Sequence, residues 1–255
     1  MLREIEVPRS SFSFITQGDA EIVTALRGRG KESIVSIKQL SSTEGVRLSP
    51  QDINELLKRR EVLETFRKAV RINSQPEGWW QDFFEGNKWI FGYGLNYQIL
   101  RQEQAQPYYG GTRFDRTGGQ RGDYLTSTMG DINFTVLVEI KTPGTPLLQG
   151  GAEIRSGAWS LSKDLTDALA QIEANIDTWY RQGSLHPDNW EELENRNVYT
   201  VQPKGIIVIG TLSQLKDSRS KRETFQRFRR SIHGIDIITF DELYHRARYI
   251  VEKQN

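Results

Sequence analysis

The 255-residue sequence contains no cysteine and only three histidines. The absence of cysteine excludes disulfide bonds, zinc-thiolate sites and thiol catalysis. His186, His233 and His245 are not spaced as paired ligands on one helix, so a histidine-rich metal site is not expected. The sequence also lacks the ~20 consecutive apolar residues that a membrane-spanning helix needs, and its first ten residues lack the apolar core of a signal peptide. We therefore expect a soluble, cytoplasmic protein with no membrane partner.

An overall excess of one charge sign is also missing, because the net charge is only +1. Apolar residues make up 36% and charged residues 26%, which is ordinary globular usage and excludes a disordered or fibrous protein. One stretch, residues 216–230, contains seven basic residues against two acidic ones. It forms either a solvated helix face or a surface that contacts nucleic-acid phosphates. Its basic residues are Lys216, Arg219, Lys221, Arg222, Arg227, Arg229 and Arg230.

The hydrophobic patterns divide the chain into two parts. Ser49-Pro50 is typical of a helix start, and an apolar stripe continues the helix to about residue 70. Ahead of it, residues 32–40 are compatible with a strand. The turn-forming residues 73–78 predict a boundary, which separates an N-terminal helical and irregular segment, 1–75, from a domain formed by 76–255.

The second part alternates between strand and helix patterns, which indicates an α/β fold with a mixed β-sheet flanked by helices. Tryptophan and phenylalanine pairs at i,i+4 spacing support its first helix, and Ser162 is the predicted N-cap of a later one. The predicted elements are a helix at 77–85, one strand or a bent pair at 89–103, strands at 121–127 and 134–141, a helix at 162–181, strands at 205–210 and 235–240, and a helix from Asp241.

A single triplet combines an acid with a lysine, Glu139-Ile140-Lys141. Side chains two residues apart on a strand share one face, so Glu139 and Lys141 project together while Val136, Val138 and Ile140 face a helix. Metal-dependent phosphodiester hydrolysis needs carboxylates for the cation and benefits from a lysine that stabilises developing charge. Taken alone the triplet is weak, because most such triplets are surface charge pairs.

Asp123 is the predicted second carboxylate. If residues 129–133 form a hairpin loop, Leu125 lies opposite Leu137 and Asp123 lies opposite Glu139. A slip of one residue would move Asp123 to the other sheet face. Asp131 lies in the turn, more than about 20 Å from Glu139, and is rejected. The predicted metal ligands are therefore Asp123 and Glu139, and the predicted cation is Mg²⁺, for which Mn²⁺ can substitute.

Five stretches in the second part match one nuclease family in order. They read EGWWQDFFEGNKWIFGYGL from 77, GDY from 122, VEIKTP from 138, SKDLTDALAQI from 162 and GIDIITFDEL from 234. With them the chain resembles the nuclease domain of the Shedu anti-phage defence proteins, a branch of the PD-(D/E)XK superfamily. The resemblance implies a restriction-endonuclease-like core in which Asp123 binds metal and Glu139 and Lys141 are the acid and the catalytic lysine. Glycine rather than proline precedes Asp123.

The resemblance further implies site roles for Glu77, Gln81 and Gln171, and an Mg²⁺-dependent endonuclease that nicks double-stranded DNA as a homo-oligomer, a tetramer. Shedu proteins usually carry a larger N-terminal region, which would make this chain a truncated form or a short member. Two alternatives stay open: a restriction or repair nuclease of the same fold, and a non-catalytic DNA-binding or oligomerisation module. A P-loop around Gly30-Lys31 is disfavoured because its flanking residues do not fit.

Overall fold

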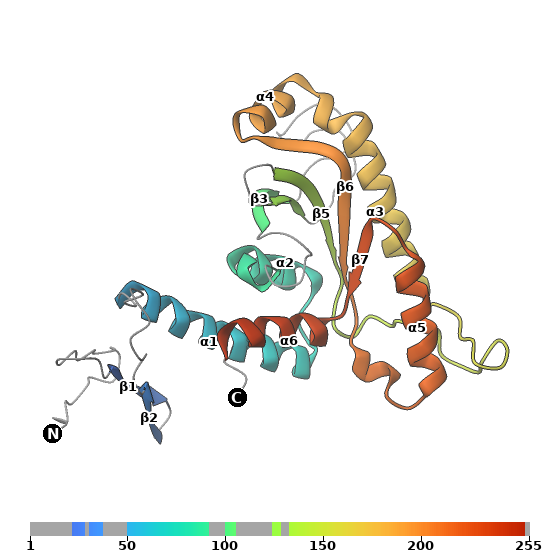
Figure 1. The fold of residues 1–255 in the computed structure, drawn as a ribbon. Coiled ribbons are helices and arrows are strands. Elements are labelled where there is room, and N and C mark those ends of the chain that lie inside the picture. Colours follow the sequence, from blue (N-terminus) through green and yellow to red (C-terminus); the bar gives the residue numbers. More distant parts are fainter. Residues whose placement is uncertain are drawn as a thin grey trace, which may run out of the picture. The chain divides into compact units, whose positions relative to one another are not determined.

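The computed structural model drawn in Figure 1 describes residues 22–28, 31–37, 50–91, 100–105, 124–128 and 133–252. Its contacts divide the chain into two units, Met1–Lys58 and Arg59–Asn255. The first unit contains an antiparallel hairpin of β1 (Ile22–Gly28) and β2 (Lys31–Ile37). Strand β2 overlaps the strand predicted at 32–40, whereas β1 is not predicted.

Helix α1 (Pro50–Ile72) begins at the proline that the sequence predicts as its first residue. Proline is favoured there because its fixed φ suits a helix and its missing N–H would have no partner in the first turn. Leu63, Phe66 and Ala69 are buried at three-residue spacing and belong to the core of the second unit. The division by contacts therefore falls within α1, earlier in the chain than the boundary predicted between residues 75 and 76.

Within the described residues, five strands form a mixed sheet in the order β3-β4-β5-β6-β7. Strand β4 (Tyr124–Thr128) lies between β3 (Leu100–Ala105) and β5 (Asn133–Ile140) and pairs with each of them in antiparallel orientation. Strand β6 (Val198–Val208) pairs in parallel with β5 and with β7 (Ile235–Ile238). The mixed sheet predicted from the alternating patterns is thus confirmed, and β6 starts well before the predicted apolar segment at 205–210.

The β4–β5 pair has the register that the sequence predicts. Tyr124 lies opposite Val138 and Leu125 lies opposite Leu137. Because side chains alternate between the faces, this register decides which residues of β4 share a face with which residues of β5. Asp123 and the loop residues 129–132 lie outside the described residues.

Helices cover both faces of the sheet (Figure 1). One face packs against α1, α2 (Glu77–Gly86) and α6 (Phe240–Val251), and the other packs against α3 (Lys163–Arg181) and α5 (Arg219–Ser231). The short helix α4 (Pro187–Asn195) precedes β6. In the described ranges, no helix combines the length and the apolar character that crossing a membrane requires.

Strand β5 is buried on both faces because its side chains alternate between the two cores. Val136, Val138 and Ile140 contact the core formed with α1, α2 and α6, as predicted, while Leu137 contacts the core formed with α3 and α5. A strand covered on both sides is typically a run of apolar residues rather than an alternating one. Any charged side chain on such a strand is consequently taken out of water.

The helix ends agree with the sequence except at the start of the last helix, and one predicted strand is wrong at its start. Ser162 caps α3 as predicted, since its hydroxyl accepts from the Leu165 N–H at 3.0 Å. The last helix begins at Phe240 rather than Asp241, because Thr239 and Glu242 form a capping box. The strand predicted from residue 89 is wrong at its start, where Lys88–Phe91 forms a 3₁₀ helix that buries Ile90 and Phe91.

Phe66 is fully buried at the centre of an aromatic cluster, with ring centroids of Trp80, Phe84 and Tyr244 at 5.7, 5.5 and 5.9 Å. We expect Phe66→Ala to lower the free energy of unfolding by about 3–5 kcal/mol, because it leaves a cavity among these rings. The control Ile72→Ala, which shortens a 66% exposed side chain on the same helix, should change it by less than about 0.5 kcal/mol. Urea denaturation measures both values, and similar values for the two variants would contradict this packing.

Candidate active site

The end of β5 brings an acid and a lysine together. Glu139 is only 2% exposed, although it carries a carboxylate, and Lys141 Nζ lies 2.8 Å from its Oε1. The lysine side chain is itself only 18% exposed. The two side chains therefore meet as the i,i+2 spacing predicts, and they form a largely buried ion pair rather than a solvated surface pair.

Backbone contacts with the next strand hold the lysine in place. The Lys141 N–H donates to Val208 O at 2.9 Å, and the Gly210 N–H donates to Thr142 O at 3.0 Å. Gly210 has φ +58°, and a Cβ there would lie 2.7 Å from Thr145 O. Only glycine satisfies both constraints, because a side chain would be strained in φ and would collide with backbone. The strand end that carries Lys141 is thus fixed by backbone geometry.

Burial sets the electrostatics of Glu139. Removal from water raises the pKa of its carboxyl, the hydrogen bond and charge of Lys141 oppose that rise, and the nearby charge of Glu77 adds to it. Its Oε2 is buried and has no hydrogen-bond partner among the described residues. A buried carboxylate oxygen without a donor is unfavourable, and a cation relieves it. The donor set at this end of β5 therefore fits a hard divalent cation, which prefers carboxylate oxygens.

Glu77 lies in the first turn of α2, and its Oε2 is 3.9 Å from Lys141 Nζ. The structure thus brings Glu77, Glu139 and Lys141 together, as three of the predicted site residues. Gln171 is exposed on α3, and Gln81 is half-buried on α2. No group of three His, Cys, Asp or Glu side chains suited to a metal occurs within the described ranges, and the predicted ligand Asp123 falls outside those ranges.

The Gln214 side chain holds the loop that follows Lys141, and the sequence analysis did not identify it. Its Oε1 accepts from the Leu147 N–H at 3.1 Å, and its Nε2 donates to Pro143 O at 3.2 Å and to Thr145 O at 3.0 Å. These bonds fix the loop that follows Lys141. No sequence pattern could reveal them, because they join residues about seventy positions apart.

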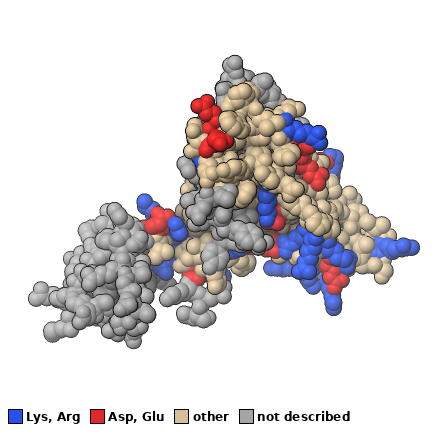
Figure 2. All heavy atoms as spheres, turned by 45° about the horizontal axis from the view of Figure 1, so that its top comes forward, with Lys and Arg blue, Asp and Glu red and all other residues tan. Residues whose placement is uncertain are grey.

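The basic stretch forms most of α5, and its charges differ in availability. Figure 2 shows Lys and Arg side chains gathered at the lower right, over the end of the molecule where α5 lies in Figure 1. Arg229, however, forms a bidentate ion pair with Glu242, in which its two terminal nitrogens lie 2.7 and 2.8 Å from the carboxylate oxygens, and its side chain is only 20% exposed. Arg229 thereby joins α5 to α6, and the stretch offers fewer solvent-facing cations than its composition suggests.

Comparisons with known proteins agree with the resemblance noted in the sequence. The family described as Shedu protein SduA, C-terminal, matches residues 74–244, which is more than half of the chain. The chain belongs to this SduA family. It is also 27% identical over 213 residues to the Shedu protein SduA of Bacillus cereus (strain B4264), covering 80% of this chain and 54% of that protein. The chain spans about half the length of the curated relative it matches.

The region that matches the SduA family contains Glu77, Glu139 and Lys141, and it extends past Glu242 in α6. Its first residues fall in the turn between α1 and α2. The family match begins close to the boundary predicted between residues 75 and 76, whereas the second compact unit begins at Arg59.

The Arg229–Glu242 pair predicts a pH-dependent contribution to stability. Burial alone would raise the pKa of Glu242, but hydrogen bonds from Arg229 and the Thr239 N–H outweigh it and lower that pKa. Because the folded pKa is depressed, the pair stabilises above the ordinary glutamate pKa of ~4.3, and the contribution is lost as pH falls through the folded value.

We expect Glu242→Gln to lower the free energy of unfolding by about 1.5–3 kcal/mol at pH 7. The difference from wild type should shrink as the pH falls below ~4. Urea denaturation across this range measures the effect, with Glu252→Gln as the control, since Glu252 forms an exposed pair with Arg248. A difference that does not change with pH would contradict the ionic origin.

Proposed function

We propose that this SduA-family chain is a Mg²⁺-dependent endonuclease of the PD-(D/E)XK type that nicks double-stranded DNA in anti-phage defence. The observation that carries the proposal is the buried carboxylate of Glu139, one oxygen of which pairs with Lys141 while the other has no hydrogen-bond partner among the described residues. An ion pair that served stability alone would not be buried here, because removing both charges from water costs free energy that apolar side chains would not cost.

In this proposal Asp123 is the second metal ligand. The β4–β5 register is the one from which the sequence argument placed Asp123 opposite Glu139, and it holds from Tyr124 to Ser127. Asp123 itself lies outside the described residues, so its role rests on the register and on the family resemblance. Glu139 and Asp123 would hold the cation between them.

In the proposed hydrolysis, the bound cation, Lys141 and Glu77 have different roles. Bound Mg²⁺ would polarise the scissile phosphate and lower the pKa of a water nucleophile. Lys141, fixed by β6 and by Glu139, places an ammonium group beside the phosphate, where negative charge grows in the transition state. Glu77, whose Oε2 lies 3.9 Å from the same ammonium, helps to orient Lys141.

Duplex DNA is the proposed partner, and the exposed cations of the basic stretch 216–230, most of which lie in α5, are its proposed phosphate contacts. These are Lys216, Arg219, Arg222, Arg227 and Arg230, while Lys221 and Arg229 are partly buried. Phosphate contacts supply affinity and register without reading sequence. A homo-oligomer, a tetramer, remains a prediction of the family resemblance.

We expect Lys141→Ala to reduce cleavage by a factor on the order of 10²–10³ while duplex affinity stays nearly unchanged, because its charge acts mainly at the transition state. Lys204→Ala is the matched control, since Lys204 is also a strand lysine paired with an acid, Asp236, at 2.7 Å. Cleavage of supercoiled plasmid with Mg²⁺ and with EDTA, together with duplex affinity at one stated salt concentration, measures the effect.

The same assay separates the alternatives. Relaxed circles as the first product indicate nicking, and linear plasmid indicates a double-strand cut. A wild-type protein that binds duplex but never cuts it would support the non-catalytic module instead. Equal cleavage by wild type and Lys141→Ala would show that Lys141 is not part of the machinery.

A further inference from the structure

The loop between the candidate site and α3 folds into a narrow hairpin that runs past α5. Leu148 and Leu161 pair as an antiparallel bridge near its base, and Arg155 and Ala158 do so near its tip. The Ile154 N–H donates to Ala158 O at 2.9 Å, and Gly157 turns the chain with φ +76°. The tip therefore has a defined backbone conformation.

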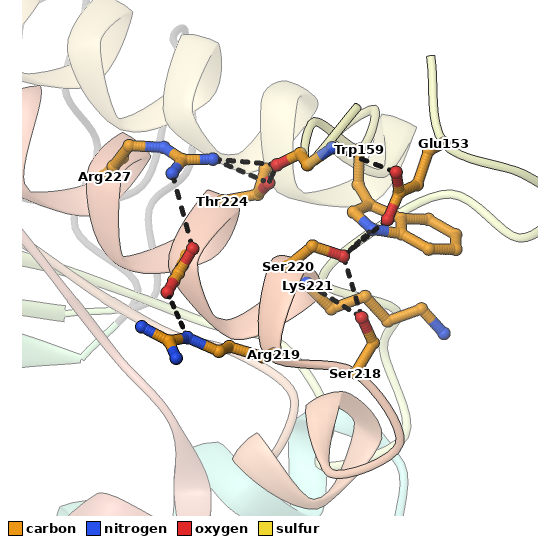
Figure 3. A network of polar contacts seen from close by, with 10 residues as sticks. Glu153, Trp159, Ser218, Arg219, Ser220, Lys221, Thr224 and Arg227 are labelled. Carbon is orange, nitrogen blue, oxygen red and sulfur yellow. Dashed lines mark hydrogen bonds and ion pairs between the residues drawn. The ribbon is translucent and has the colours of Figure 1, made fainter. Parts of the chain in front are cut away.

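Side chains fasten this hairpin to α5 (Figure 3). Ser220 donates to Glu153 Oε1 at 2.6 Å and accepts from Trp159 Nε1 at 2.9 Å. Lys221 Nζ lies 4.6 Å from the centroid of the Trp159 ring, a cation–π contact. Bonds from the Arg227 guanidinium and the Thr224 hydroxyl reach Gly157 O at 2.9 and 3.2 Å. The hairpin and the basic helix consequently form one surface.

The tip of this surface carries an exposed apolar side chain next to an exposed cation. Ile154 is 68% exposed, the largest exposure of any large hydrophobic side chain in the described part of the chain, and Arg155 beside it is exposed as well. Ile72 and Leu185 are nearly as exposed, at 66% each, so exposure alone does not indicate a partner. The position of Ile154 does, because hydrogen bonds hold it beside Arg155 on a tip joined to the basic helix α5, which suits a negatively charged partner that takes up an apolar side chain.

We propose that Ile154 is a wedge that inserts between base pairs of duplex DNA, with Arg155 in the same groove. The inference rests on the proposed nuclease function and deepens it. Proteins that kink DNA from the minor groove do so with apolar wedges flanked by cations, and α5 supplies further cations beside this tip.

Chain length permits the wedge and the candidate site to act on one DNA segment. Ile154 follows Lys141 by 13 residues (154 − 141), so the two lie at most about 45 Å apart. That is about 13 base pairs at ~3.4 Å per pair. Because Gln214 and the hairpin contacts fold this segment back, the separation is shorter still.

The test compares DNA bending by wild type and three variants of the full chain, using a duplex of about 25 base pairs with a fluorophore pair at its ends, in EDTA. Ile154→Ser removes the wedge. Leu185→Ser removes an equally exposed apolar side chain, 66% exposed, outside the hairpin. Arg230→Ala removes an exposed cation of α5 and leaves the apolar tip intact.

We expect wild type and Leu185→Ser to raise energy transfer between the duplex ends, as a kink of 20–90° does. Ile154→Ser should lose that rise and bind about tenfold more weakly, with an unchanged slope of log affinity against log salt. Arg230→Ala should keep the rise while its salt slope falls by about one.

Three outcomes would overturn the inference. Bending by Ile154→Ser equal to wild type removes the wedge while leaving the nuclease proposal intact. Absence of duplex binding by wild type, together with absence of cleavage, removes both proposals. Binding to vesicles of phosphatidylglycerol and phosphatidylcholine that is lost in Ile154→Ser, with DNA bending unchanged, would assign the tip to a membrane surface.

Discussion

The buried carboxylate of Glu139 is the constraint on which the arrangement around β5 depends. A carboxylate that is 2% exposed loses its hydration and stays charged only if nearby groups compensate. Lys141 compensates one oxygen at 2.8 Å, and β6 positions Lys141 through the backbone of Val208. The other oxygen has no hydrogen-bond partner within the described ranges, and this imbalance motivates the proposed cation. Stability alone would favour an apolar residue at this position.

The two hydrophobic cores hold β5 from both sides and so keep the buried charge of Glu139 in place. Trp80 and Phe84 of α2 pack on one face and Ile172 of α3 packs on the other, so β5 has little freedom to twist its charged end into water. Helices that cover the two faces of the sheet also carry the proposed functional residues. Helix α2 carries Glu77 at the site, and α5 carries cations and contacts the hairpin whose tip includes Ile154. Scaffold and proposed chemistry therefore share the same elements.

Local patterns predicted most strands of the mixed sheet, the β4–β5 register and the Ser162 cap because each depends on neighbouring residues. Leu125 opposite Leu137 follows from alternation and an odd loop length, and Ser162 caps α3 because its hydroxyl reaches an N–H three residues on. Long-range contacts were beyond the sequence. Counting charges could not show that Arg229 is committed to Glu242, and apolar composition could not show that residues 88–91 turn as a 3₁₀ helix. The proposed role of Asp123 remains a prediction.

The central claim is that Glu139 and Asp123 hold one divalent cation beside Lys141. The most direct measurement is the anomalous scattering of crystals grown with Mn²⁺, compared between wild type and Asp123→Asn. The account predicts an anomalous peak in contact with Glu139 Oε2 and with Asp123, within about 2.0–2.3 Å of both oxygens, and a weaker peak or none in the variant. A wild-type peak bound elsewhere, or a peak at Glu139 that Asp123→Asn leaves unchanged, would contradict the account.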